Sequence, residues 1–279
     1  MTSPILYSLN HVNFSYPNRQ SALNDVTLSV APQERIALLG ANGSGKSTLL
    51  KLLGGLLTTQ EGQIEFCGHP LTEATLHHPE FNRLFRTKVG IVFQNSEAQL
   101  FCPTVWEEIS FGPIHLGIPP EETRQRVNDL LQMLRIERLR DRIPEQLSGG
   151  EKKRVAIAAV LATHPDILLL DEPTTALDPR SRWELVDIIL NLQAANKTVI
   201  TATNDLEIVP AIAQRLCILD ETNHLLADGS AEELLARKDI LEQANLIHVH
   251  THTHPDAIHR HAHLHQNLVA DHHKQPEKQ

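Results

Sequence analysis

The stretch GANGSGKST, residues 40–48, decides how the surrounding chain folds. It fits the pattern G-x-x-x-x-G-K-[S/T], in which glycines allow backbone N–H groups to turn towards phosphate oxygens. An apolar run at 36–39 precedes the stretch, and KSTLLKLLGGLL, which begins at Lys46, has the spacing of a helix. The order strand, glycine-rich loop and helix predicts the start of an α/β unit built around a parallel sheet.

This loop predicts a nucleotide site that uses Mg²⁺. The helix that follows directs its positive end at the same anions. Lys46 supplies a charge for the β- and γ-phosphates, and the Ser47 hydroxyl is a hard ligand suited to Mg²⁺. An ordinary glycine-rich turn is the competing interpretation. The nucleotide-binding residues expected here are Gly40, Asn42, Gly43, Ser44, Gly45, Lys46, Ser47 and Thr48.

A second motif, ILLLDEP at 167–173, ends an apolar strand with two carboxylates. Asp171 is placed to hold Mg²⁺ directly or through water, and Glu172 is placed to polarise an attacking water. An acidic turn after a strand is common, so this motif gains its weight from the loop at 40–48.

A third motif, LSGGEKKR at 147–154, opens a helix. Ser148 and Glu151 form an S-x-x-E capping box, and Gly149 and Gly150 leave the backbone amides bare at the positive end of that helix. The sequence therefore predicts a second anion-binding helix terminus. A well-capped helix with no ligand is the alternative.

Together these three motifs resemble the nucleotide-binding subunits of ABC transporters, over roughly residues 4–240. The resemblance implies ATP hydrolysis by a head-to-tail dimer, formed by two copies of this chain or with a similar ATPase. In that dimer the phosphate loop of one subunit faces Ser148, Gly149 and Gly150 of the other.

The same resemblance implies roles for single residues. Tyr16 resembles the aromatic residue that stacks on adenine, although a core aromatic at a strand end would look the same. Gln94 resembles the catalytic glutamine that senses Mg²⁺, with Ser47 and Asp171 as the other ligands. Asp178 resembles the aspartate that crosses the dimer interface.

Asn204 departs from the family pattern, which usually has a histidine here that contacts the γ-phosphate. Asparagine still donates a hydrogen bond, but it is shorter and never charged. Two interpretations remain. Either Asn204 performs a weaker version of the catalytic role and hydrolysis proceeds through Glu172, or hydrolysis is strongly slowed and the dimer stays closed longer.

The segment 95–118 resembles the ATPase subunits of energy-coupling factor importers, particularly those for cobalt and nickel. The resemblance implies an integral membrane coupling subunit and a substrate-binding membrane subunit as partners, with this chain peripheral on the cytoplasmic face of the membrane. A mixed groove for a partner helix is expected, with ordinary helical packing as the alternative. Its expected residues are Phe101, Val105, Trp106, Glu107, Glu108 and Phe111.

Composition limits the function. The 279 residues carry a formal charge of −9, which argues against a nucleic-acid partner. Three scattered cysteines indicate reduced thiols, and no apolar run approaches the roughly 20 residues of a membrane span. Three alternatives stay open: a vitamin importer of the same architecture, a soluble ABC ATPase that acts on DNA or ribosomes, and, from the tail alone, a metal-binding or storage protein.

The expected architecture is an α/β P-loop NTPase core of the ABC ATPase type with an N-terminal antiparallel β portion. Residues 1–245 form this domain, with a helical subdomain at about 95–155, and 246–279 form a disordered, histidine-rich tail.

The tail predicts weak, multi-site binding of Ni²⁺ or Co²⁺, because neutral imidazole suits both ions. In an extended chain its alternating histidines lie on one side, and in a helix they form i, i+4 pairs such as His250/His254 and His261/His265. Low-complexity sequence without a role is the alternative. The candidate ligands are His248, His250, His252, His254, His259, His261, His263 and His265.

Overall fold

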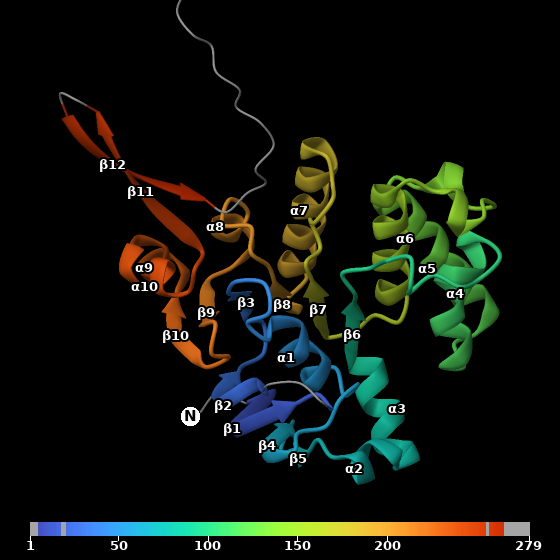
Figure 1. Cartoon of the computed structure of the whole chain (residues 1–279). Coiled ribbons are helices and arrows are strands. Elements are labelled where there is room, and N and C mark those ends of the chain that lie inside the picture. The colour runs from blue at the N-terminus through green and yellow to red at the C-terminus, as the bar shows by residue number, and fades with distance from the viewer. Residues whose placement is uncertain (1–4, 18–20, 255–256, 265–279) are drawn as a thin grey trace, which may run out of the picture.

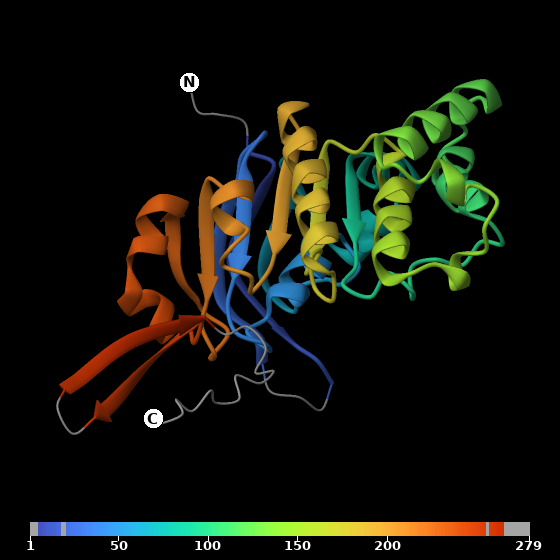
Figure 2. The ribbon, with the colours of Figure 1, turned by 90° about the horizontal axis from the view of Figure 1, so that it is seen from above.

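The computed structural model describes residues 5–17, 21–254 and 257–264 (Figure 1). The described chain contains a four-stranded sheet, a six-stranded sheet, a helical subdomain and a two-stranded hairpin. Figures 1 and 2 place the helical subdomain and the hairpin at opposite ends of the six-stranded sheet.

The four-stranded sheet is the predicted antiparallel β portion. Its order is β2-β1-β4-β5, with β1 at Tyr7–Ser15, β2 at Ser21–Val30, β4 at Glu61–Phe66 and β5 at His69–Pro70. Alternate residues of β1 are buried, as expected for a strand with one face on a core. The Tyr7 hydroxyl donates to the Leu53 carbonyl at 2.9 Å and so ties this sheet to the first helix.

The six-stranded sheet has the order β10-β9-β3-β8-β7-β6. β3 (Arg35–Leu39), β6 (Val89–Val92), β7 (Ile167–Asp171), β8 (Thr198–Ala202) and β9 (Arg215–Leu219) run parallel, and β10 (Leu225–Ser230) is an antiparallel edge strand. Every residue of β7 and β8 is buried, which explains their continuous apolar sequence. Because β3, β7 and β8 are parallel neighbours, the loops that follow them meet at one edge of the sheet.

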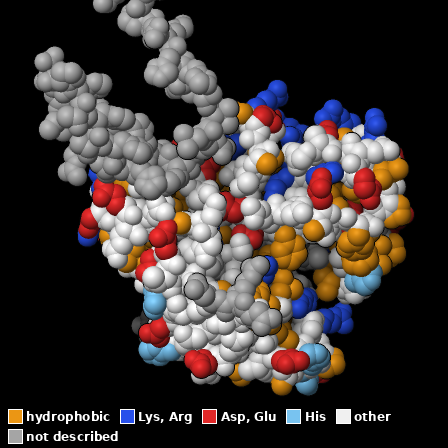
Figure 3. All heavy atoms as spheres, viewed as in Figure 1, with side chains coloured by type: hydrophobic (Ala, Val, Ile, Leu, Met, Phe, Trp, Pro, Cys, Tyr) orange, Lys and Arg blue, Asp and Glu red, His pale blue; other side chains and the backbone are white. Residues whose placement is uncertain are grey.

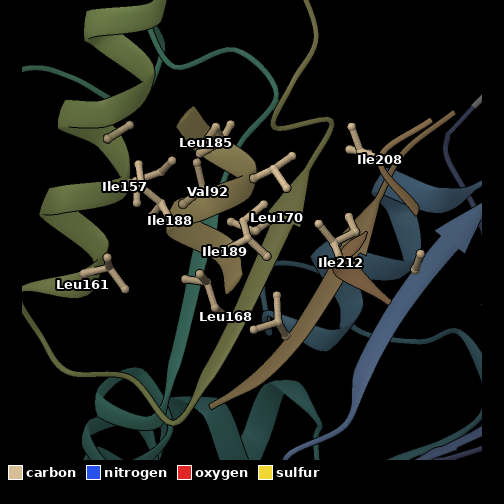
Figure 4. Packing of buried hydrophobic residues seen from close by; sticks show 14 of the residues in the cluster. Val92, Ile157, Leu161, Leu168, Leu170, Leu185, Ile188, Ile189, Ile208 and Ile212 are labelled. Atoms are coloured by element: carbon tan, nitrogen blue, oxygen red, sulfur yellow. The ribbon is translucent and has the colours of Figure 1, made fainter. Parts of the chain in front are cut away.

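Two hydrophobic cores lie on opposite faces of this sheet. Ile167 and Leu169 of β7 pack into the core shared with the four-stranded sheet and α1 (Lys46–Leu53). Leu168 and Leu170 pack into the other core. Figure 4 shows part of this core, including both leucines and Ile188. The helices that flank the sheets are α2 (Glu73–His77), α3 (Pro79–Lys88), α7 (Pro179–Ala194), α8 (Val209–Ile212), α9 (Ala231–Ala236) and α10 (Lys238–Gln243).

The helical subdomain is inserted between β6 and β7. It consists of α4 (Val105–His115), α5 (Pro120–Met133), the 3₁₀ turns Glu137–Leu139 and Pro144–Gln146, and α6 (Gly149–Leu161). α6 packs against both α4 and β6, so it connects the subdomain to the sheet.

The C-terminal segment begins with two paired strands, and the disorder of the histidine-rich tail stays a prediction. β11 (Ile247–His254) and β12 (Ala257–Leu264) form an antiparallel hairpin. Alternation of histidine with β-branched residues such as Val249 and Thr251 favours an extended backbone, and pairing satisfies the backbone groups on the facing edges of the two strands. Leu246 and Ile247 are buried in the core, at 3% and 7% exposure. Residues 265–279 lie outside the described chain.

Candidate nucleotide-binding site

A cavity of about 640 Å³ lies where the loops after β3 and β7 meet. Its volume falls within the range of ordinary small-molecule sites. The residues that line it are Tyr16, Ser21, Ala22, Asn42, Gly43, Gly45, Lys46, Ser47, Thr48, Gln94 and Glu172. Most of the predicted site is therefore brought together here, whereas Ser21 and Ala22 of β2 are additions that no motif indicated.

Glycine is required at two positions of the phosphate loop. Gly45 has φ +98°, and a Cβ on it would lie 2.3 Å from the Ala22 carbonyl oxygen. Gly40 has φ +155°, and a Cβ there would lie 2.7 Å from the Leu219 carbonyl oxygen. Close contact of the loop with β2 and β9 thus fixes the direction in which α1 leaves the loop.

Lys46 is held inside the loop that it follows. Its side chain is 6% exposed, and its ammonium group donates to the carbonyls of Gly40 at 2.8 Å and Ala41 at 3.1 Å. Glu172 Oε1 lies 3.8 Å from the same nitrogen. Burial lowers the pKa of Lys46, although the carboxylates of Glu172 and Asp171 act in the opposite direction.

Glu172 combines burial with an unusual backbone. Burial raises the pKa of its carboxyl group above the ordinary value, although Lys46 opposes this effect. A carboxyl group of raised pKa is a better proton acceptor, which suits a general base. The residue has φ +43°, and its backbone N–H donates to the Ala202 carbonyl at 2.9 Å, so β8 secures this strained position.

The predicted Mg²⁺ ligands fit a magnesium ion chemically. The Ser47 hydroxyl donates to Asp171 Oδ1 at 2.8 Å, and Gln94 lines the same cavity. A hydroxyl, a carboxylate and an amide carbonyl are all hard oxygen donors, the type that Mg²⁺ prefers. Asp171 is 5% exposed, and its carboxylate is covered by the Ser47 hydroxyl that donates to it. This burial suits an indirect contact between Asp171 and Mg²⁺, through the hydroxyl or a water.

Tyr16 lies at the rim of the cavity and is half-buried. Its ring packs edge-on against Phe14, with 5.0 Å between centroids, and its hydroxyl lies 3.4 Å from Thr48 Oγ1. One part of the ring therefore belongs to the core and another part faces the cavity. Ser44, by contrast, does not line the cavity, because its side chain is buried under the loop.

Asn204 lies at the edge of the phosphate loop, as its position after β8 predicts. Its exposed side chain donates from Nδ2 to Asn42 Oδ1 at 3.5 Å, and its backbone N–H is hydrogen-bonded to the Glu172 carboxylate. The loop around it is held by Arg182 of α7, which contacts the carboxylates of Asp205 and Glu207 at 2.9 Å each. Sequence reasoning missed Arg182, because its partners lie more than 20 residues away.

Two further residues stabilise the site without any predicted role. Asn223 donates to the Gly43 carbonyl at 2.9 Å and so fastens the phosphate loop to the turn between β9 and β10. Lys153 of α6 is 4% exposed and donates to the carbonyls of Phe93, at 3.2 Å, and Gln94, at 2.8 Å. Burial lowers the pKa of Lys153 to about 8, although Asp171 and Glu172 oppose the shift.

The predicted second anion site does not line this cavity. Ser148 caps α6, where its side chain accepts from the Glu151 N–H and its own N–H donates back to the Glu151 carboxylate at 3.0 Å. Ser148 and Gly149 are exposed, and a Cβ on Gly149 would meet nothing within 4 Å. Asp178 is also exposed and accepts from the backbone N–H groups of Arg180 and Ser181.

The segment 95–118 forms a different surface from the predicted groove. Phe101 and Ile114 are exposed at 63% and 59%, and Phe111 packs edge-on against Phe101 with 4.9 Å between centroids. Figure 3 shows hydrophobic side chains gathered over the helical subdomain. Val105 is fully buried, and Glu108 points inward to accept from the Phe101 and Cys102 N–H groups. Neither residue can belong to an outer groove.

The candidate metal ligands of the tail are placed only in part. The histidines from His248 to His263 lie on β11 and β12, and His265 lies outside the described residues. Among the residues whose side chains the structure describes, no group of three His, Cys, Asp or Glu side chains could hold a metal ion. None of the described helices has the length and apolar character needed to cross a membrane.

Comparison with known proteins shows which family the chain resembles. The model of the ABC transporter family matches residues 23–175. The chain is 44% identical over 244 residues to the nickel import ATP-binding protein of Rhodobacter capsulatus, which covers 86% of this chain and 95% of that relative.

Two solved structures have the same fold. The structure of cbiO1 from Clostridium perfringens, part of the ABC transporter complex cbiONQ, aligns with a TM-score of 0.74 at 33% identity, over 88% of this chain and 96% of that one. The ATP-binding cassette MJ0796, a dimer bound to ADP and phosphate, aligns with a TM-score of 0.72 at 29% identity, over 81% and 98%.

Proposed function

The chain belongs to the ABC transporter family of ATPases, and on that premise we propose that it powers an energy-coupling factor importer of a divalent transition metal, cobalt or nickel. The observation that carries this proposal is the convergence of Lys46, Ser47, Gln94 and Glu172 on one cavity at the end of the parallel sheet. Relatives of the chain include ATP-binding proteins of energy-coupling factor transporters.

Within this cavity each residue has a distinct task. Lys46 and the bare amides of the phosphate loop bind the phosphates of ATP, and Tyr16 supplies a ring for adenine. Ser47, Asp171 and Gln94 hold the Mg²⁺ that neutralises phosphate charge when it is bound. Glu172 accepts a proton from the attacking water.

Asn204 completes the nucleotide site from the loop after β8. Its side chain, which donates to Asn42 Oδ1 at 3.5 Å, would donate a hydrogen bond to the γ-phosphate instead when ATP is bound. We favour slowed but continuing hydrolysis, because the buried Glu172 is retained as the base.

The dimer is the second element of the proposal. Ser148, Gly149 and Asp178 are exposed in the single subunit although they belong to nucleotide motifs, so the ATP of a partner subunit would complete their contacts. A solved cassette of the same fold is dimeric with ADP and phosphate bound. ATP binding would close the two subunits, and hydrolysis would reopen them.

The membrane partner is the third element. Phe101, Phe111 and Ile114 form an exposed apolar surface beside the loop that carries Gln94, so a partner helix seated there would respond to the nucleotide. The chain would then sit peripherally on the cytoplasmic face of the membrane, while a coupling subunit and a substrate-binding subunit span it.

Cobalt or nickel is favoured as cargo by two observations. A relative of 44% identity is named for nickel import, and histidines alternate along the C-terminal hairpin. A vitamin importer of the same architecture is the second candidate, because its ATPase subunit would have the same nucleotide cavity.

Transport by the assembled complex tests the proposal. Membrane vesicles that contain this chain and its membrane partners should accumulate radioactive Ni²⁺ or Co²⁺ only with ATP. Substitution of Glu172→Gln should reduce hydrolysis and uptake by at least about 100-fold, because the general base is lost, and should leave ATP binding intact. ATP-dependent uptake of a vitamin without uptake of either metal would overturn the metal assignment.

A further inference from the structure

The loop after β6 presents Gln94 to the nucleotide cavity. Two hydrogen bonds inside this loop lie on either side of Gln94. The Phe93 N–H donates to the Gln99 side chain at 3.1 Å, and the Gln99 N–H donates to the Ser96 carbonyl at 3.1 Å. The backbone of Gln94 itself is held from another element, the helix α6.

Lys153 of α6 binds the backbone on both sides of the Gln94 Cα. Its ammonium donates to the Phe93 carbonyl at 3.2 Å and to the Gln94 carbonyl at 2.8 Å. These carbonyls belong to successive peptide planes. Because each plane is rigid, fixing both of them limits φ and ψ of Gln94. The direction in which the Gln94 side chain leaves the backbone is limited with them.

From this geometry we propose that Lys153 is a positioning residue for ATP hydrolysis, which holds Gln94 in the orientation that its contact with Mg²⁺ requires. The inference rests on the proposed role of Gln94 at the nucleotide site. Lys153 is 4% exposed and does not line the nucleotide cavity, so it acts through the backbone of Gln94 and not on the nucleotide. Small displacements of a group at an active site lower the rate strongly, which gives such a contact its value.

Burial distinguishes Lys153 from the lysine beside it. Hydrogen bonds from a charged donor are strong, and little water competes for a donor that is buried. Lys152, by contrast, pairs with Glu97, whose side chain is 68% exposed, and ion pairs of this kind contribute little. Both lysines hold the same loop, but only Lys153 contacts Gln94. Lys152 is therefore a control for charge and for position on α6.

A double-mutant cycle tests the proposal through ATP hydrolysis by the full-length chain in the assembled complex. Lys153→Met should lower kcat by at least about tenfold. The KM for MgATP should change by less than about threefold, because Lys46 and the phosphate loop still bind the phosphates. With Gln94→Ala already present, Lys153→Met should lower kcat by less than about twofold, because the residue that it positions is gone.

The cycle separates this role from a direct effect of charge. The carboxylates of Asp171 and Glu172 also act on the Lys153 ammonium. An equal loss of kcat in both backgrounds would overturn the proposal and assign the effect to those carboxylates. A Gln94→Ala variant with normal kcat would instead refute the proposed role of Gln94, and the positioning role with it. Neither result depends on which cargo the complex transports.

Hydrogen exchange in the nucleotide-free chain provides a second measurement that does not use activity. Lys153→Met should speed exchange of the backbone amides at 93–99 by at least about tenfold, while the amides of β7 and β8 keep their rates and so show an intact fold. Lys153→Gln, which keeps an N–H donor, should have a smaller effect. Lys152→Met should change exchange and kcat by less than about twofold. Unchanged exchange at 93–99 in Lys153→Met would overturn the proposal.

Discussion

Lys153 shows at the residue scale how a buried charge is held at the nucleotide site. Its ammonium donates to the carbonyls of Phe93 and Gln94 from the helix that Ser148 caps. This one side chain therefore joins the LSGGEKKR motif at 147–154 to the loop that carries Gln94. A neutral lysine amine still has two N–H donors, so these hydrogen bonds persist when the proton is lost.

Lys153 should make stability depend on pH. Its pKa is about 8 in the folded protein, below the ordinary value of 10.5. Between pH 8 and 10.5 the unfolded state binds more protons than the folded state, so stability rises with pH in this window. We expect the stability advantage of the wild type over Lys153→Met to grow by on the order of 2–3 kcal/mol from pH 7.5 to 10.5 in urea unfolding.

Lys152→Met is the matched control for this experiment. Lys152 is the neighbour on α6 and pairs with the exposed Glu97. The same difference in pH dependence for both variants would show that the burial of Lys153 is not its cause.

Asn204 is the second residue with a measurable consequence. Asn204→His would restore a longer donor beside Asn42 and should raise ATP turnover of the assembled complex by about tenfold or more, within the range of catalytic donors. Steady-state phosphate release measures this effect, with Glu172→Gln in the same background as the inactive reference. No gain from histidine would eliminate the idea that Asn204 slows hydrolysis.

At the scale of elements, the contact between β2 and the start of α1 sets the position of the phosphate loop. Gly45→Ala would place a methyl group 2.3 Å from the Ala22 carbonyl oxygen in addition to straining φ. We expect ATP affinity to fall by more than about 100-fold, because the loop must move away from β2. Fluorescent nucleotide titration measures the loss.

Gly43→Ala is the control, because its φ of +89° carries the same kind of strain but no atom lies within 4 Å of the added carbon. It should cost about 1–2 kcal/mol of folding stability and bind ATP much better than Gly45→Ala. Equal loss in the two variants would mean that backbone strain, and not the contact with β2, explains the requirement.

Sequence alone predicted those elements whose signals are contiguous. The loop at 40–48, the strand before Asp171 and the helix capped by Ser148 are each read within one stretch, and parallel neighbours bring their ends together. Contacts between distant segments were not predictable, such as Asn223 with Gly43. The direction of individual side chains on α4 was not predictable either. Glu108 was expected to line an outer groove, but its side chain is buried.

The hairpin register was unpredictable for a related reason. Alternating histidines fit a single extended strand, a helix or a paired strand equally well. The register depends on where the chain reverses. The position of that turn decides whether His250 pairs with His261 or with a different residue of β12.

At the scale of the whole molecule, the exposed Ser148 and Asp178 predict ATP-dependent dimerisation. With Glu172→Gln to prevent hydrolysis, ATP should shift the chain from monomer to dimer in light scattering. A further Ser148→Arg should abolish the dimer by placing a bulky charge at the interface, while nucleotide still binds the single subunit.

Gln63→Arg provides the comparison, because it adds the same charge at an exposed position on β4, in the antiparallel sheet. It should dimerise normally. A dimer that survives Ser148→Arg would place the interface elsewhere on the molecule.

The hydrogen bonds inside the nucleotide cavity have a consequence for turnover. Lys46 is bound to loop carbonyls, Ser47 to Asp171, and Asn204 to Asn42. At these three side chains a nucleotide would bind by exchange, because each new contact replaces one that the protein already made. Their contribution to affinity is then a small difference between two similar sets of bonds, which also eases the departure of ADP. Such a cavity suits repeated cycles better than storage.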